Sequence, residues 1–158
     1  MRNVRVLAVI AALLFMAMAI YTHPLKPGIP VLQLTFSEVA FRSILSEWTP
    51  FGVEIFKRHF LIDLPFLVCY GCLGYLLSTQ TRLFERFAPA ARSLLALALP
   101  AAAVADATEN AFHLTFLFGA GPFTQVQYFA AGVAASTKWL LILAFIGGAL
   151  YAKLKTAE

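Results

Sequence analysis

The chain has 158 residues, of which 61% are hydrophobic and 13% are charged, and its mean hydropathy is +0.80. A soluble domain carries about 25% charged residues, so this composition excludes an ordinary soluble protein. The net charge of +4 does not indicate nucleic-acid binding, because the basic residues flank apolar blocks. We therefore predict an all-α integral membrane protein with one domain over residues 1–158, in contact with the lipid bilayer and with no nucleic-acid partner.

The first apolar block follows Arg2 and Arg5 and predicts a membrane span over residues 6–21. A basic start before a short apolar core is also typical of a signal peptide. We interpret the block as a retained helix that starts in the cytoplasm. Three prolines and a glycine between Thr22 and Pro30 predict an extended loop after it.

An amphipathic segment over about residues 37–58 lies between the first two spans. Ser37 is the predicted N-cap of a short helix that runs to about Trp48. The predicted apolar side of this helix consists of Val39, Ala40, Ile44, Leu45 and Trp48. We interpret it as an amphipathic helix on the outer membrane surface, and a lid over a site beneath it is the alternative.

Thr49 and Pro50 predict the N-cap and first position of a long helix. Pro65 removes a backbone hydrogen bond, which predicts a kink near Asp63. The predicted fold is an all-α membrane protein, a four-helix bundle with four transmembrane helices over residues 6–21, 60–78, 93–118 and 128–151.

Most basic residues flank the predicted spans on a single side: Arg2, Arg5, Arg82, Arg86, Arg92, Lys153 and Lys155. Because basic residues concentrate in cytoplasmic loops, we expect a multi-pass protein with both termini in the cytoplasm. Lys57 and Arg58 lie on the opposite side and weaken this asymmetry without reversing it.

Polar residues interrupt the third span at helical spacing. Asp106, Glu109, Asn110 and His113 fall at i, i+3, i+4 and i+7, which is one helix face. Ionisable side chains at membrane depth are costly in lipid and are functional candidates. A rise of ~1.5 Å per residue puts Glu109 and Lys138 at depths of roughly 14 and 15 Å, so the two can meet.

We predict a buried polar site in the outer half of the bundle, lined by Asp63, Tyr70, Asp106, Glu109, Asn110, His113 and Lys138. Three carboxylates face one lysine and one histidine, so an uncompensated carboxylate holds a proton or binds a cation. The predicted ligand is a polar small molecule, a lipid headgroup or a proton. If the chain is an enzyme, Glu109 or His113 is the candidate acid or base.

The main alternative is a non-catalytic accessory or assembly subunit of a membrane complex. In that case the polar residues only fix helix packing, as polar side chains commonly do in membrane bundles. The chain would then have a membrane-protein partner rather than a ligand.

Metal and haem sites are weaker alternatives. The spacing of Asp106, Glu109 and His113 matches the Glu-x-x-His motif of di-iron bundles only loosely. His59 and His113 could approach each other for a bis-histidine haem, but His59 follows Lys57 and Arg58, which predicts an interfacial position for it. We assign no metal and no cofactor.

Two short motifs carry resemblances. Cys69-Tyr70-Gly71-Cys72 resembles the CxxC of four-helix membrane thiol oxidoreductases of the DsbB and vitamin K epoxide reductase types, which implies quinone-linked redox chemistry as a third alternative. Those enzymes use a second cysteine pair, which this chain lacks, and helical geometry points both cysteines away from Asp63. We therefore interpret them as packing residues.

The overall pattern resembles small uncharacterised bacterial membrane proteins with four spans and an amphipathic segment after the first. The matching motifs are Asp63-Leu64-Pro65 in the second span, one residue shorter than the Asp-x-x-Pro of those proteins, and Asp106-Ala107-Thr108-Glu109-Asn110 in the third, where they have Asp-x-x-Glu-Asn. The resemblance covers most of the chain. It implies this fold and a location in the bacterial inner membrane, and it implies no activity.

Overall fold

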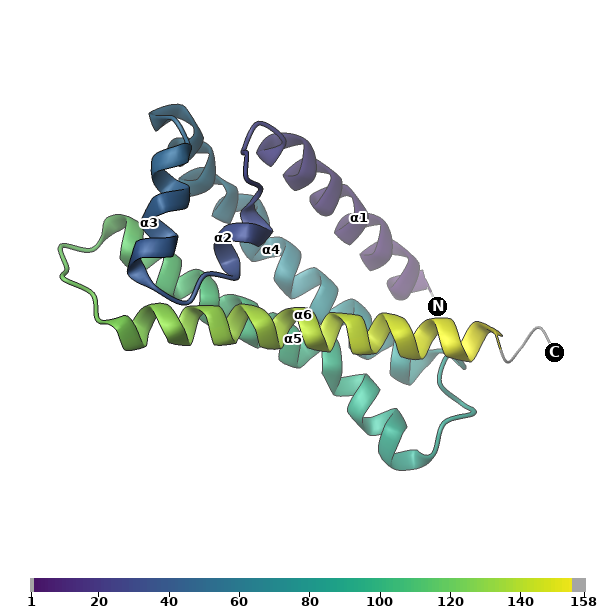
Figure 1. Cartoon of the computed structure of the whole chain (residues 1–158). Coiled ribbons are helices and arrows are strands. Elements are labelled where there is room, and N and C mark those ends of the chain that lie inside the picture. Colours follow the sequence, from purple (N-terminus) through teal and green to yellow (C-terminus); the bar gives the residue numbers. More distant parts are fainter. Residues whose placement is uncertain (1, 155–158) are drawn as a thin grey trace.

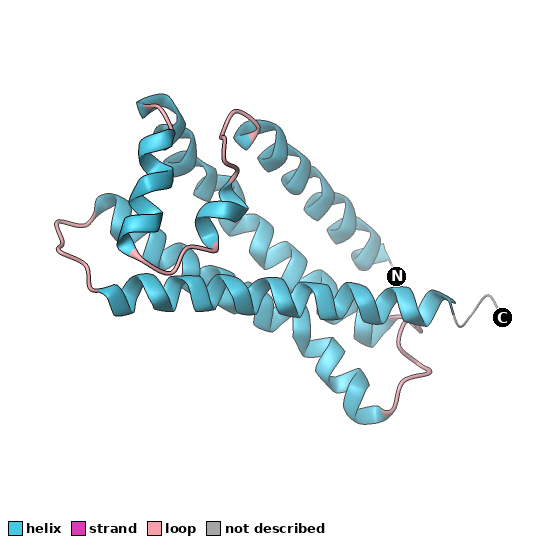
Figure 2. Cartoon of the chain, in the orientation of Figure 1, coloured by secondary structure: helices cyan, strands magenta, loops and turns pink. Residues whose placement is uncertain are grey.

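The computed structural model describes residues 2–154, which form helices without any strand. In chain order the helices are α1 Arg2–Thr22, α2 Ile29–Gln33, α3 Glu38–Glu47, α4 Pro50–Gln80, α5 Pro89–Phe118 and α6 Gln125–Leu154 (Figures 1 and 2). Four of them, α1, α4, α5 and α6, are long and apolar enough to cross a membrane. The predicted four-span fold is confirmed, and Lys155 lies outside the described residues.

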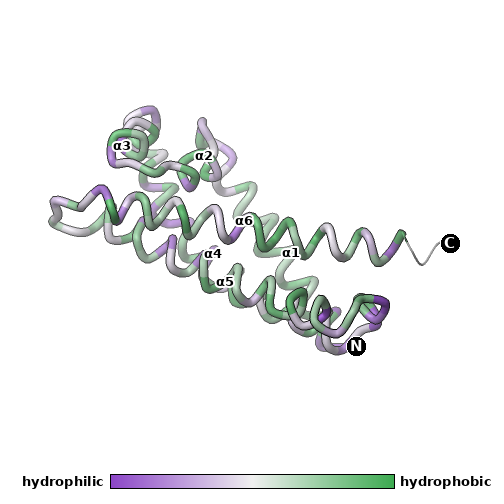
Figure 3. Tube along the Cα trace, turned by 60° about the horizontal axis from the view of Figure 1, so that its bottom comes forward, coloured by the Kyte–Doolittle hydropathy of each residue, from purple (hydrophilic) through white to green (hydrophobic). Residues whose placement is uncertain are grey.

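The long helices pack in sequence, α1 against α4, α4 against α5 and α5 against α6. Both chain termini lie at the same end, and α2 and α3 lie at the other (Figure 1). We call these the basic end and the α3 end of the bundle. Apolar residues dominate the middle of the long helices, and hydrophilic residues gather toward their ends and in the loops (Figure 3).

The predicted helix starts are confirmed by their caps. The Ser37 hydroxyl accepts a hydrogen bond from the Ala40 amide at 3.3 Å, and α3 begins directly after it. The Thr49 hydroxyl accepts from the Gly52 amide at 3.3 Å, with proline in the first turn of α4. Pro65 lies within α4, which continues without a break to Gln80.

Two details of the segment before α4 differ from the prediction. The expected loop over residues 22–30 gives way to α2, because Pro30 occupies its first turn, where a proline costs no hydrogen bond. On α3 the buried side is formed by Phe41, Ile44 and Trp48, whereas Val39 is 81% exposed. Val39, predicted on the apolar side of this helix, therefore does not pack on the bundle.

Two apolar cores lie along the bundle. The core near the α3 end is aromatic and includes Phe41, Trp48, Phe56, Phe60 and Tyr128. The core toward the basic end consists largely of small residues of α5 with Leu67, Tyr70, Phe84 and Phe145 around them. The polar residues of α5 lie between these two cores.

Candidate functional site

One face of α5 carries the central part of the site. Asp106, Glu109, Asn110 and His113 are all buried, and Glu109 is 0% exposed. Their spacing places them on the side of α5 that lies between α4 and α6, away from lipid. The predicted single polar face of the third span is therefore confirmed.

Lys138 of α6 completes the charge pairing. Its Nζ donates to Glu109 Oε2 at 2.6 Å and to Asp106 Oδ1 at 3.0 Å, and its side chain is 3% exposed. The ammonium also lies 5.5 Å from the centre of the Trp139 ring. The predicted meeting of Glu109 and Lys138 is confirmed, and one lysine serves two carboxylates.

Two residues of α4 bind α5 from the other side. Asn110 Nδ2 donates to Asp63 Oδ2 at 2.5 Å, and the Tyr70 hydroxyl donates to Asp106 Oδ2 at 3.1 Å. Because Asp63 and Tyr70 are seven residues apart, both point from the same side of α4. All seven predicted site residues therefore lie together in one place, which we call the polar cluster.

Two polar atoms of the site are buried without a hydrogen-bond partner among the described residues, Glu109 Oε1 and Trp139 Nε1. The Oε1 atom lies 3.6 Å from His113 Nδ1, too far for a hydrogen bond. Leaving a buried carboxylate oxygen unpaired is costly when the group is ionised. A proton on this oxygen would remove that cost.

His59 extends the cluster toward the α3 end, and the sequence analysis misplaced it. We expected an interfacial position beside Lys57 and Arg58, but His59 is 2% exposed. Its Nδ1 donates to the Phe56 carbonyl oxygen, and its ring stacks on the Phe56 ring at 4.8 Å. His59 lies four residues before Asp63, so the two side chains share one face of α4. This spacing is the signal in the sequence that predicts a buried position for His59.

Helix α3 covers the cluster at the α3 end. The Phe41 ring lies 5.3 Å from the His113 ring and 5.7 Å from the Tyr128 ring, and Phe41 is 2% exposed. The helix thus packs on the bundle through Phe41 and keeps Arg42 and Glu38 on its exposed side, paired at 2.6 Å. Phe41 of α3 thus covers His113, and a role of α3 as a lid stays a prediction.

The described residues offer little support for a metal or a haem. Among residues 2–154, no group of three or more His, Cys, Asp or Glu side chains is arranged to hold a metal ion. The Phe56 ring packs against both imidazoles of the candidate haem pair, His59 and His113. An aromatic side chain therefore contacts each imidazole that a haem would use as a ligand.

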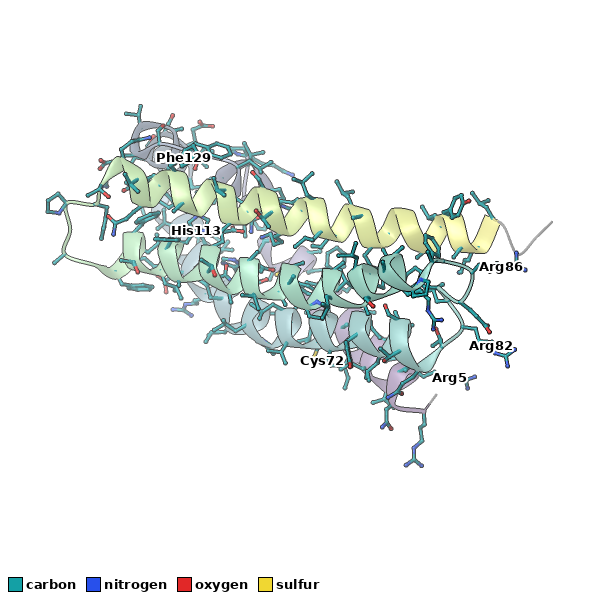
Figure 4. All side chains as sticks on the ribbon, turned by 90° about the horizontal axis from the view of Figure 1, so that it is seen from below. Arg5, Cys72, Arg82, Arg86, His113 and Phe129 are labelled. Atoms are coloured by element: carbon teal, nitrogen blue, oxygen red, sulfur yellow. The ribbon has the colours of Figure 1, made fainter. Side chains whose placement is uncertain are left out.

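Surface pockets lie away from the polar cluster. One, of about 570 Å³, is an apolar groove between α4 and α5 that includes Cys72. The other, of about 500 Å³, runs along the exposed side of α5. Neither is lined by a residue of the polar cluster. Cys72 is exposed and Cys69 is partly buried, and both are free thiols, as expected for residues that face away from the cluster (Figure 4).

These features define the class of the protein. Four apolar helices with the length to span a bilayer are those of a multi-pass membrane protein, and three of them share a buried polar cluster. Comparison with protein-family models, with curated proteins and with solved structures finds no match to this chain. The function therefore has to be argued from the cluster itself.

Proposed function

We propose that the polar cluster binds a proton inside the membrane and passes it between the cluster and the α3 end. The observation that carries the proposal is the charge count. Asp63, Asp106 and Glu109 are three buried carboxyl groups, and Lys138 is the one buried ammonium that faces them among the described residues. Isolated charges are too costly at this depth, so at least one carboxyl group holds a proton or binds a cation.

Of the ligand classes considered, a proton fits the packing best. A small molecule or a lipid headgroup needs a pocket lined by the polar residues, whereas these residues are closely packed and none is more than 8% exposed. A proton needs only a hydrogen-bonded acceptor. Glu109 is the preferred carrier because its Oε1 lacks a hydrogen bond while its Oε2 is held by Lys138.

The neighbours of Glu109 provide a route toward the α3 end. The 3.6 Å gap between Glu109 Oε1 and His113 Nδ1 closes with a small side-chain rotation. A neutral imidazole accepts a proton at one nitrogen and releases it from the other. His113 lies under Phe41 of α3, so lifting α3 would expose the imidazole to water.

Infrared difference spectroscopy tests the protonated carboxyl. We expect wild type at neutral pH to show the carbonyl stretch of a protonated carboxyl group, shifted in D₂O, and Glu109→Gln to lose it. Glu47→Gln, which changes an exposed glutamate of α3, is the matched control and should keep the band. A band that survives in Glu109→Gln, Asp106→Asn and Asp63→Asn alike would overturn the proposal.

A second candidate function, a non-catalytic accessory or assembly subunit, is favoured by one observation. The hydrogen bonds of the cluster join α4 to α5 and α5 to α6, as structural crosslinks would. Proton exchange with solvent, read by a pH-sensitive dye after a jump of the purified protein from neutral to alkaline pH, separates the two. We expect wild type to release a proton that Glu109→Gln does not release. Equal release by the two proteins would favour the structural subunit.

For the location, we propose a bacterial inner membrane with both termini in the cytoplasm. Support for the orientation comes from Arg5, Arg82 and Arg86, which lie together at the basic end (Figure 4). Reporter fusions in the 81–88 loop and in the 119–124 loop should report opposite sides of the membrane, with the first in the cytoplasm. The reverse result would invert the direction of the proposed proton route.

A further inference from the structure

The basic end of the bundle carries a strong excess of positive charge. Six exposed basic side chains belong to it, and Glu85 is the one acidic side chain there among the described residues. The basic set is Arg2, Arg5, Arg82, Arg86, Arg92 and Lys153. Figure 4 shows the labelled arginines, from α1 and from the α4–α5 loop, together at this end.

The α3 end is different, because its charges nearly balance. Outside the polar cluster it carries four basic and three acidic side chains, and two pairs are bonded within their own helices. These pairs, Glu38 with Arg42 and Glu54 with Arg58, have distances of 2.6 and 2.7 Å. At the basic end, Arg82 and Glu85 of the α4–α5 loop lie 3.8 Å apart, and both side chains are mostly exposed.

Local structure keeps the positive charge of the basic end at the rim of the bundle. The first turns of α1 and α5 contain no acidic residue to offset the partial positive charge of a helix N-terminus, and both helices begin at this end. In the α4–α5 loop, Phe84 is 1% exposed and packs edge-on against Phe145 of α6 at 5.4 Å. That anchor fixes the loop, so Arg82 and Arg86 on either side of Phe84 stay exposed at the rim.

We propose that the basic end is a binding surface for the headgroups of anionic phospholipids. Guanidinium groups bind phosphate oxygens through paired charge-assisted hydrogen bonds. The arginines flank helices that are apolar enough to lie in the bilayer, which places them at the depth of lipid phosphates. The partner class follows from this position and from the unbalanced charge, and it does not depend on the proposed proton function.

The test uses purified protein in phosphatidylcholine bilayers with a trace of spin-labelled lipid. The measured quantity is the fraction of label immobilised on the protein, compared between phosphatidylglycerol and phosphatidylcholine labels. One basic residue near an anionic surface is worth about a fivefold change in affinity. We expect wild type to favour phosphatidylglycerol by about fivefold or more, and we expect Arg82→Gln, Arg86→Gln and Arg92→Gln combined to bring the ratio close to one.

The matched control changes three basic residues at the α3 end, Arg42→Gln, Lys57→Gln and Arg58→Gln, and should keep the preference. High salt applied to the unmodified protein should lower the preference by screening, which tests the proposal without any substitution. Equal immobilisation of the two labels by wild type would overturn the proposal. A preference that survives in the basic-end variant, or that falls equally in both triple variants, would also overturn it.

Discussion

The half of the bundle near the α3 end and the half near the basic end use the same three helices in different ways. Near the α3 end, α4, α5 and α6 meet through the polar cluster and an aromatic core. Near the basic end, they meet through small apolar residues of α5 such as Ala98, Ala102 and Ala103. Small residues let helix backbones approach closely, and this suffices for association in a membrane.

The approach of the helices near the basic end is close. A methyl group built on Gly74 of α4 would lie 2.4 Å from Leu99 Cβ of α5, so the two helices touch through a residue without a side chain. This half therefore shows that the chain can hold its helices together without charges. A buried lysine and three carboxyl groups are not needed for packing alone, which supports a functional role for the polar cluster.

The largest effect should come from removing the lysine of the polar cluster. Lys138→Ala leaves Asp106 and Glu109 without their cation, and breaking a buried ion pair costs about 3 kcal/mol or more. We expect this loss in the free energy of unfolding in detergent. Lys153→Ala, an exposed lysine on the same helix, is the control and should change little.

Adding Glu109→Gln to Lys138→Ala should restore part of the lost stability, because the glutamine cannot ionise beside Asp106 once the ammonium is absent. The double-mutant cycle then gives a coupling energy between the two residues. Strictly additive effects would contradict the pairing that unites α5 and α6.

The second effect concerns the half without charges. Gly74→Ala places a methyl group against Leu99 Cβ, and overpacking of this kind costs about 1–3 kcal/mol. We expect a lower melting temperature by circular dichroism in detergent. Gly147→Ala is the matched control, since its added methyl meets no atom within 4 Å and alanine favours a helix. Equal behaviour of the two variants would mean that α4 and α5 do not pack closely at Gly74.

Much of this architecture could be predicted from the sequence, because its signals are local. N-cap residues and first-turn prolines mark the helix starts, as at Thr49 and Pro50, and the long apolar blocks define the spans. The polar face of α5 followed from helical periodicity, and the meeting of Glu109 with Lys138 followed from the rise per residue. In each case the regular geometry of α-helices was enough.

The parts that the sequence did not predict depend on tertiary contacts. His59 was placed at the interface because its neighbours Lys57 and Arg58 are charged, whereas its own side of α4 is buried. On α3, Val39 and Phe41 are both apolar, and only the position of His113 and Tyr128 on other helices selects Phe41. The function of the polar cluster stays a prediction. The resemblance of the chain to bacterial four-span proteins and the orientation of the chain in the membrane also stay predictions.

The third effect tests whether α3 shields the polar cluster. Phe41→Leu keeps the position apolar but removes the ring over His113. We expect the packing of α3 on the bundle to weaken by about 1 kcal/mol. The fraction of molecules in which α3 has moved away from His113 should then rise about fivefold. The measurement is the rate at which diethyl pyrocarbonate labels His113, read by mass spectrometry. His23 is exposed and serves as the internal control. An unchanged His113 rate, with His23 labelled normally, would mean that α3 does not control access.

The smallest effect is expected for the cysteine pair. Cys72 is exposed in the apolar groove between α4 and α5, Cys69 is partly buried, and neither lines the polar cluster. Replacing both with alanine removes little buried surface, so stability in detergent should fall by less than about 1 kcal/mol. The protonated-carboxyl band and the proton release should stay at wild-type levels, because no step of the proposed route uses a thiol. Loss of the proton release at a normal protein level would give the Cys69–Cys72 pair a role in the function and would favour a quinone-linked thiol reaction instead.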